Sequence, residues 1–137
     1  MHYDTVVEYR RHFERRYCRG AIVTFDEIQV RFRKGHFDHC FFESVGEKDD
    51  TFSRRRAERI DWIKAALADP DAELRVGWDS RSRRPATDRR VVIVVRDYVV
   101  VIRLIGGRRA EFVTAFVAGD RTLRQIRTNP RWPQKNR

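Results

Sequence analysis

The alternation of hydrophobic and polar positions is clearest between residues 90 and 118, where three apolar segments are separated by two short polar breaks. The segments are 91–95, 98–105 and 110–118, and the breaks are Arg96-Asp97 and 106–109. Each segment is short, rich in β-branched and aromatic residues and bounded by turn-forming residues, which is typical of strands rather than of a buried helix. The pattern predicts an antiparallel meander of three strands.

The register of this meander predicts two faces of different character. A two-residue turn at Arg96-Asp97 places Val95 opposite Tyr98. A loop of two or four residues within 106–109 then keeps the alternating side chains of the third strand on matching faces. A three-residue loop would exchange the faces of that strand. One face is then wholly apolar and suited to packing on a helix. It consists of Val91, Ile93, Val95, Val100, Ile102, Leu104, Val113, Ala115 and Val117. The other face consists of Arg90, Val92, Val94, Val99, Val101, Arg103, Phe112, Thr114 and Phe116.

Arg103 and Thr114 are polar exceptions on the second face, because each stands between two apolar residues inside its strand. Valine and phenylalanine neighbours would partly cover both side chains. A half-buried arginine needs an anionic partner. A protein carboxylate and a ligand phosphate satisfy this requirement equally well, whereas Arg90, at a strand start, also fits a solvated position.

Helices are predicted on the N-terminal side of the meander. Apolar side chains recur at near-helical spacing over residues 3–17, and Gly20 follows as a stop signal. A second helix over 54–68, with Ser53 as its N-cap and Asp69-Pro70 at its end, carries an apolar stripe that would cover the sheet. Residues 24–27 have the form of a capping box, but residues 28–33 alternate with strand period, which favours a strand after Thr24.

The remaining segments complete an α+β fold. Residues 73–78 predict a strand, 79–88 a basic loop that leads into the meander, and 121–127 a short helix. The expected architecture is one or more N-terminal helices followed by an antiparallel sheet of four or more strands, with one helix packed on its apolar face. With 137 residues, 41% of them hydrophobic, the chain suits one domain over 1–127 and a basic, extended tail over 128–137.

Charge narrows the class of partner. The formal net charge is +10, and such a balance indicates a polyanion, either nucleic acid or an acidic protein. Apolar runs are too short to span a bilayer, and the N-terminus lacks the core of a signal peptide, so we expect a cytoplasmic protein without membrane contact. Two cysteines are too few for a disulfide scaffold.

His36 and His39 form the most chemically suggestive stretch, because two imidazoles can act as general base and general acid. Packing of one ring beneath phenylalanines and exposure of the other explains the pair as well. Together with Cys40 they offer three potential metal ligands, but no second ligand pair stands nearby, so we expect no metal.

Arginines supply the candidate substrate contacts. Arg56 continues the apolar stripe of the predicted helix over 54–68, either as a snorkelling side chain or as a phosphate ligand. The basic loop and the strand that follows it add candidate substrate-binding residues, namely Arg81, Arg83, Arg84 and Arg90.

Several dispersed motifs, taken together, resemble the phage and mobile-element branch of the barnase, EndoU, colicin and RelE-like ribonuclease superfamily. They are His36-Phe37-x-His39-Cys40-Phe41, the run from Arg56 to Ile63, Gly77-Trp78-Asp79, residues 98–102 and residues 111–116. The resemblance covers roughly residues 22–127, and a strand rather than a helix at 28–32 departs from the family pattern.

The resemblance implies a metal-independent endoribonuclease, and many members serve as toxins. Its last-strand threonine matches Thr114, and its upstream histidine matches His36 or His39. With the arginines noted above, the expected catalytic set is His36, His39, Arg56, Arg103 and Thr114, with no cofactor. The histidines would share the proton transfers, the two arginines would bind the scissile phosphate, and Thr114 would donate a hydrogen bond to it. The implied partners are RNA, either tRNA or ribosome-bound mRNA, and an acidic antitoxin or immunity protein. A non-catalytic module that binds nucleic acid or a protein partner through the same basic surface is the alternative.

Overall fold

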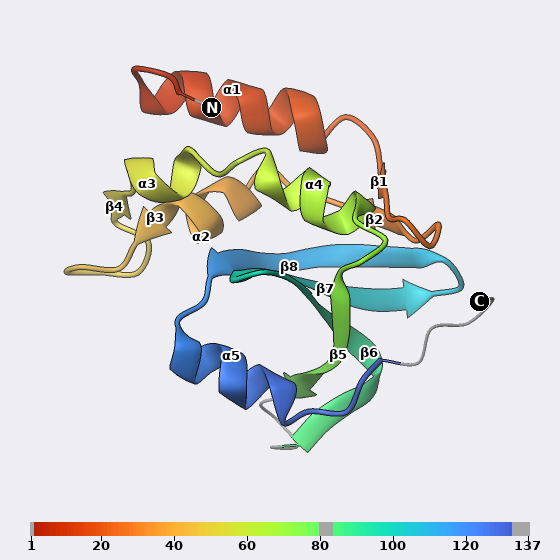
Figure 1. The fold of residues 1–137 in the computed structure, drawn as a ribbon. Coiled ribbons are helices and arrows are strands. Elements are labelled where there is room, and N and C mark those ends of the chain that lie inside the picture. Colours follow the sequence, from red (N-terminus) through yellow and green to blue (C-terminus); the bar gives the residue numbers. More distant parts are fainter. Residues whose placement is uncertain (1, 80–83, 133–137) are drawn as a thin grey trace.

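The computed structural model describes residues 2–79 and 84–132, and its centre is a six-stranded sheet with the order β1-β2-β8-β7-β6-β5 (Figure 1). All neighbouring strands are antiparallel except β2 and β8, which run parallel. The strands are β1 (Ile22–Val23), β2 (Gln29–Arg31), β5 (Glu73–Asp79), β6 (Arg84–Val95), β7 (Tyr98–Gly106) and β8 (Arg109–Val117). The predicted α+β class, with N-terminal helices and a mostly antiparallel sheet, is confirmed.

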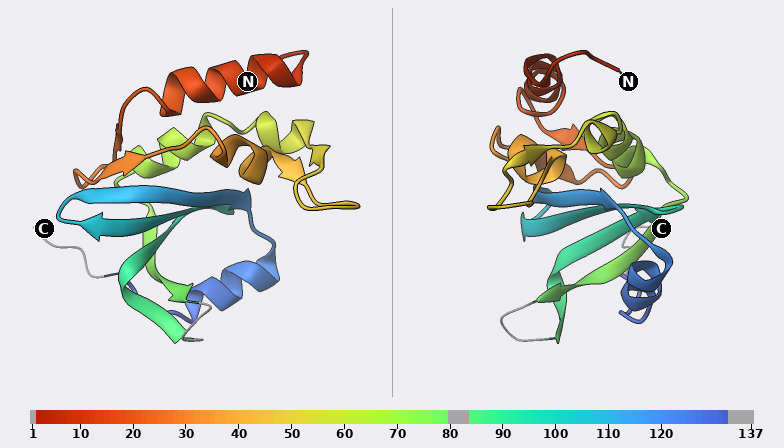
Figure 2. Two further views of the ribbon diagram at one scale, coloured as in Figure 1. Left: turned by 180° about the vertical axis from the view of Figure 1, so that it is seen from behind. Right: turned by 90° about the vertical axis from the view of Figure 1, so that its left-hand side faces the viewer.

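Helices cover the sheet unequally. Four of them lie on one side, with α1 outermost, and one helix lies on the other side (Figures 1 and 2). They are α1 (Val6–Tyr17), α2 (His36–Phe41), α3 (Arg54–Ala57) and α4 (Trp62–Ala68) on the first side, and α5 (Asp120–Arg127) on the second. A small hairpin of β3 (Phe42–Glu43) and β4 (Thr51–Phe52) adjoins α2. Within the described part of the chain, no helix has both the length and the apolarity needed to cross a membrane.

The main core lies between α1 and the sheet and is rich in aromatic rings. Helix α1 starts with a capping box between Thr5 and Glu8. Its buried face carries Phe13, whose ring lies 5.3 to 6.1 Å from four other aromatic rings. These belong to Tyr17, Phe32, Phe37 and Phe41. The cluster joins α1 to α2, and this packing sets the position of α2 above the sheet.

The predicted helix over 54–68 is wrong in one respect, because it is interrupted between α3 and α4. The buried hydroxyl of Tyr17 donates to the carbonyl of Ile60 at 2.6 Å and accepts from the amide of Lys64 at 3.0 Å. In a continuous helix, that amide and that carbonyl would bond each other. A side chain inserted into the ladder therefore breaks the helix, as expected physically. The predicted N-cap is correct, since the Ser53 hydroxyl accepts from the Arg56 amide.

The meander has the predicted hairpin between β6 and β7, with Val95 opposite Tyr98. Between β7 and β8 the register shifts twice, once at Ile105 in β7 and once at Val113 in β8. The two bulges cancel, so Thr114 pairs with Val101 as predicted. Between the two bulges, at residues 110–112, the side chains of β8 point to the opposite faces from those predicted.

This reversal corrects two of the predicted face assignments. Phe112 pairs with Ile102 and is buried in the main core, stacked on Phe32, instead of sharing a face with Arg103. Val113, at the bulge, lies beside Thr114 instead of in the core. A bulge inserts one residue into one strand, and a shift of one residue exchanges the faces.

The structure also decides two further predictions, the strand after Thr24 and the basic loop over 79–88. Residues 29–31 form a strand, as favoured from the alternation, and the Thr24 hydroxyl accepts the amide of Ile28 in the turn that precedes it. The basic loop predicted over 79–88 is wrong for residues 84–88, because β6 begins at Arg84 and pairs with β5 as far as Asp79. The strand pairing continues past a register shift at Gly77.

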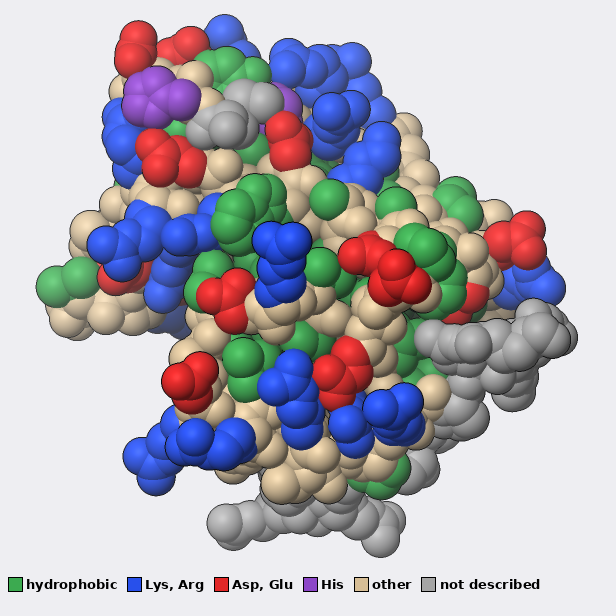
Figure 3. All heavy atoms as spheres, viewed as in Figure 1, with side chains coloured by type: hydrophobic (Ala, Val, Ile, Leu, Met, Phe, Trp, Pro, Cys, Tyr) green, Lys and Arg blue, Asp and Glu red, His purple; other side chains and the backbone are tan. Residues whose placement is uncertain are grey.

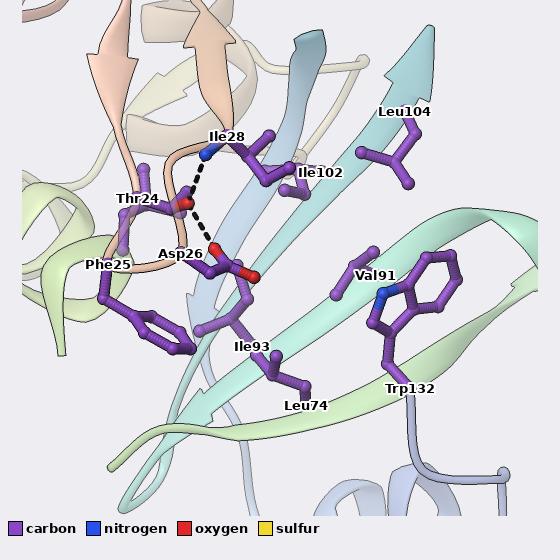
Figure 4. Close-up of a pocket in the computed structure, with 11 residues that line it drawn as sticks. Thr24, Phe25, Asp26, Ile28, Leu74, Val91, Ile93, Ile102, Leu104 and Trp132 are labelled. Carbon is purple, nitrogen blue, oxygen red and sulfur yellow. Dashed lines mark hydrogen bonds between the residues drawn. The ribbon is translucent and has the colours of Figure 1, made fainter. Parts of the chain in front are cut away.

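The start of the C-terminal tail docks on the sheet. Trp132 donates its amide to the carbonyl of Leu74, and Val76 donates to the carbonyl of Pro130, which places this segment along β5. The Trp132 ring lines a cavity of about 40 Å³ together with Leu74 and Val91 (Figure 4). A volume of this size has room for water but not for a larger ligand. The ring thus closes one end of the core.

We expect Trp132→Ala to lower the free energy of unfolding by about 2 kcal/mol, because it removes a half-buried aromatic ring and enlarges the cavity beneath it. Urea denaturation followed by circular dichroism measures the change. Arg131→Ala is the matched control, since that side chain is exposed and the neighbouring backbone bonds remain. An unfolding midpoint equal to that of the wild type would contradict the role of the ring.

Candidate functional site

A groove of about 450 Å³ runs between the second face of the sheet and α5. Val92, Val99 and Val101 form its floor, and polar side chains stand at its margins. Among these are Arg90 and Thr114, which the sequence placed on this face. Gly77 also lines the groove, where a Cβ atom would lie 2.6 Å from that of Arg90. Glycine therefore allows β5 to pass close beside the arginine.

Arg103 lies on the same face, directly opposite Arg90 in β6 and Glu111 in β8. Its guanidinium donates to Glu111 Oε1, and Arg33 donates to Oε2 of the same carboxylate at 2.7 Å. The hydrogen bond from Arg103, with the charges of both arginines, holds the pKa of Glu111 below its usual range. Of the two partners that the sequence left open for Arg103, the structure shows the carboxylate. An arginine has five N–H donors, so others remain for a ligand.

His36 stands beside this cluster at the start of α2. Its ring packs edge-on against Phe112, with the centroids 5.1 Å apart. Nδ1 accepts the backbone N–H of Arg33 at 2.9 Å, so the neutral ring carries its proton on Nε2. Burial lowers the pKa of His36, and the Arg33 and His39 charges lower it further, against an opposite effect from Glu111. The neutral imidazole is thus the favoured form, and it presents an Nε2–H donor.

We expect His36 to titrate below the ordinary histidine pKa of about 6.5 in an NMR titration of the imidazole signals. Because folding lowers this pKa, the unfolded chain binds more protons below about pH 6.5, and His36 makes stability fall as pH drops through that window. His36→Gln should weaken this part of the pH dependence. Titration of His36 above 6.5 would contradict the bond to the Arg33 amide.

His39 lies one helical turn further along α2 and is exposed. Its ring forms no hydrogen bond with any other residue in 2–79 or 84–132. Neither ring nitrogen is therefore engaged by a residue that the structure describes. Spacing of three residues places His39 and His36 on neighbouring positions of one helix surface.

Cys40 follows His39 on α2 and contacts Thr114 and Ala115 of β8. The thiol is buried against β8, and burial raises its pKa to about 12, although the Ala115 backbone and the Thr114 side chain oppose the rise. A neutral buried thiol is a poor metal ligand and a poor nucleophile. In the described part of the chain no three His, Cys, Asp or Glu side chains are grouped to hold a metal ion, and this includes His36, His39 and Cys40.

Arg56 does not join Arg103. It lines a separate pocket, to which Ala115 contributes from β8, whereas Arg103 bonds Glu111 four residues earlier on that strand. The structure therefore does not bring the two arginines together at one cavity. The sequence pattern, which assigned both to the scissile phosphate, did not foresee this separation.

The predicted basic loop is only partly described. Arg81 and Arg83 lie outside the described residues, and Arg84 is placed only as the first residue of β6, opposite Asp79. Arg90 is therefore the member of this group whose side chain can be assigned to the groove.

Sequence reasoning missed Glu111 and Arg33. Glu111 precedes Phe112, which the predicted register put on the same face as Arg103. The bulge at Val113 reverses this, so that Glu111 and not Phe112 shares the face of Arg103. Arg33 follows a strand whose parallel pairing with β8 has no local sequence signal. The available signal was a carboxylate, Glu111, between two apolar residues of a predicted strand.

A further histidine cluster was also missed. His12 bonds Asp61 through Nε2 at 2.7 Å and the Tyr3 hydroxyl through Nδ1 at 3.0 Å. The His12 side chain is only 7% exposed. Since both ring nitrogens are already engaged inside the helical layer, this cluster ties α1 to the turn before α4.

Comparison of the chain with family models, with curated proteins and with solved structures found no match.

Proposed function

We propose that this protein is a metal-independent endoribonuclease. The 2′-hydroxyl of the RNA attacks the adjacent phosphorus, a new O2′–P bond forms and the P–O5′ bond breaks, which leaves a 2′,3′-cyclic phosphate and a free 5′-hydroxyl. The proton removed from the 2′-hydroxyl is replaced by one delivered to O5′. This route needs a proton carrier and positive charge or hydrogen bonds at the phosphoryl oxygens.

The observation that carries the proposal is the pair of imidazoles on α2, beside β8. One ring is held by a backbone hydrogen bond, and the other has no hydrogen bond to a described residue. His39, the second of these, takes the proton from the 2′-hydroxyl, then returns it to O5′. The backbone bond to Nδ1 of His36 leaves its Nε2–H as a donor to a phosphoryl oxygen. The sequence did not distinguish which histidine acts as base, and this bond favours His39.

Arg103 and Thr114 complete the proposed site from the second face of the sheet, whereas α2 lies on the first side. The phosphate is therefore held around β8 beyond Glu111, where the pairing with β2 ends. Arg103 supplies positive charge while Glu111 holds it in place, and Thr114 donates a hydrogen bond to the phosphate from the margin of the groove. A groove of about 450 Å³ with an apolar floor accommodates a nucleotide beside that phosphate. Arg90 lines the same groove and extends the positive charge along the strand.

The net charge of +10 supports a polyanionic partner. The proposed partner is RNA in the cytoplasm, either tRNA or ribosome-bound mRNA. A nuclease with this surface needs control in the cell that makes it. An acidic antitoxin or immunity protein would provide that control by complementary charge. These assignments belong to the same proposal and rest on the same basic surface.

The test incubates the purified protein with total RNA, with DNA as the control, and in parallel with translating ribosomes. RNA fragments that end in 2′,3′-cyclic phosphate are expected, DNA should stay intact because it lacks the internal nucleophile, and EDTA should leave the rate unchanged. Loss of cleavage in EDTA with recovery on addition of zinc would contradict the metal-independent route. If RNA stays uncut in both settings, the protein is a non-catalytic binding module.

A further inference from the structure

A second pocket lies at the end of the helical layer, between α3 and the far ends of β7 and β8. Its volume is about 280 Å³. Arg55 and Arg56 of α3 line it together with Arg59 from the turn that follows this helix, and the three are called here the α3 arginines. Tyr98 and Phe116 contribute aromatic surface to the same pocket. Phe116 also lines the groove that contains Thr114, so the two cavities are neighbours along β8.

The charge of this pocket is uncompensated. None of the described residues that line it is acidic, and within 2–79 and 84–132 no carboxylate forms an ion pair with its three arginines. By contrast, Arg10 and Arg103 each bond a carboxylate. In Figure 3, Lys and Arg side chains gather over the end of the helical layer that carries α3, next to a hydrophobic patch. Three like charges at one pocket favour an anionic ligand.

Neutral groups hold two of these guanidinium groups in position. Arg56 Nη1 donates to the carbonyl of Phe42 at 3.0 Å, and Arg59 Nη1 donates to the carbonyl of Arg55 at 2.9 Å. These bonds orient the side chains without cancelling their charge. A guanidinium that is fixed in this way loses less conformational entropy when it binds a phosphate.

An exposed aromatic ring adjoins the pocket. Trp62 is 45% exposed, the Arg59 guanidinium lies 5.3 Å from the centre of its ring, and Tyr98 packs edge-on beneath it at 5.4 Å. A large exposed ring held by a buried neighbour is a stacking platform for a nucleobase. The arginines and the tryptophan therefore offer the two kinds of contact that bind single-stranded nucleic acid.

We propose that the α3 arginines and Trp62 form a second RNA subsite, which binds a phosphate on the same strand but away from the scissile bond, with the neighbouring base stacked on Trp62. The proposal rests on the proposed function, and it gives Arg56 a role in strand binding. These arginines line a pocket of their own and not the groove that contains Thr114, so the subsite orients the strand and does not act on the reacting atoms.

The test measures binding of a short single-stranded 2′-O-methyl RNA, which lacks the internal nucleophile and therefore stays intact. Arg55→Gln with Arg59→Gln should weaken binding at least tenfold and reduce the slope of log affinity against log salt by about one. Arg15→Gln with Arg19→Gln is the matched control, because it removes two exposed arginines at the other end of the helical layer, and it should change affinity less than twofold. Equal loss in both variants would overturn the subsite.

Two measurements do not depend on the stability of that variant. In wild-type protein, the Nε–H NMR signals of the α3 arginines should shift on addition of the oligonucleotide, and tryptophan fluorescence should be quenched in wild type but not in Trp62→Phe. Absence of both changes would overturn the subsite. If the oligonucleotide binds as described while RNA is never cleaved, the nuclease proposal fails and the subsite stands. If RNA is cleaved equally well without Arg55 and Arg59, the subsite fails alone.

Discussion

Replacement of His39 by alanine is expected to lower the rate of RNA cleavage by about a hundredfold or more, because the variant has no group to carry the proton between O2′ and O5′. His39 is exposed on α2 and makes no side-chain hydrogen bond with a described residue, so the protein should keep its stability. Single-turnover cleavage of an oligonucleotide, together with a thermal unfolding curve, measures the two properties separately.

Two other histidines provide the comparison. His36→Gln retains an N–H donor and should lower the rate less than His39→Ala does, since it removes one hydrogen bond to the phosphate. His2→Ala is the control, because His2 is exposed and bonds Glu58 away from the proposed site. Full activity of His39→Ala would contradict its role as the proton carrier, and a larger loss in His36→Gln than in His39→Ala would exchange the two assignments.

The second large effect concerns the folded state. Phe13→Ala should lower the free energy of unfolding by about 3 to 5 kcal/mol, because it deletes a fully buried ring that contacts four other aromatic rings. The loss is large for a domain of this size, whose total stability is of the order of 5 to 15 kcal/mol. Since this cluster holds α2 above the sheet, activity should fall with stability.

Val7→Ala on the same helix is the matched control, because Val7 is 56% exposed and its truncation should change stability by no more than about 0.5 kcal/mol. Urea denaturation of both variants measures the difference. A loss of less than about 1 kcal/mol in Phe13→Ala would show that the aromatic cluster does not hold the helical layer on the sheet.

The sequence by itself determined the elements with strong local periodicity. The hairpin at Arg96-Asp97, the presence of a helix within residues 3–17 and the cap at Ser53 all follow from patterns within a few residues. It also determined that one face of the sheet is core, since Val91, Ile93, Val100 and Ile102 are all buried. Thr114 could be assigned to the other face because the two bulges cancel before that position.

Only the tertiary structure decided which side chains meet. The break between α3 and α4 depends on the hydroxyl of Tyr17, which is more than forty residues away in the chain. The partner of Arg103 depends on the bulge at Val113. Grouping of Arg55, Arg56 and Arg59 against Phe116 depends on where a four-residue helix and the turn after it dock. Local periodicity reports which surface of an element is buried, whereas these contacts depend on long-range packing, which has no period in the sequence.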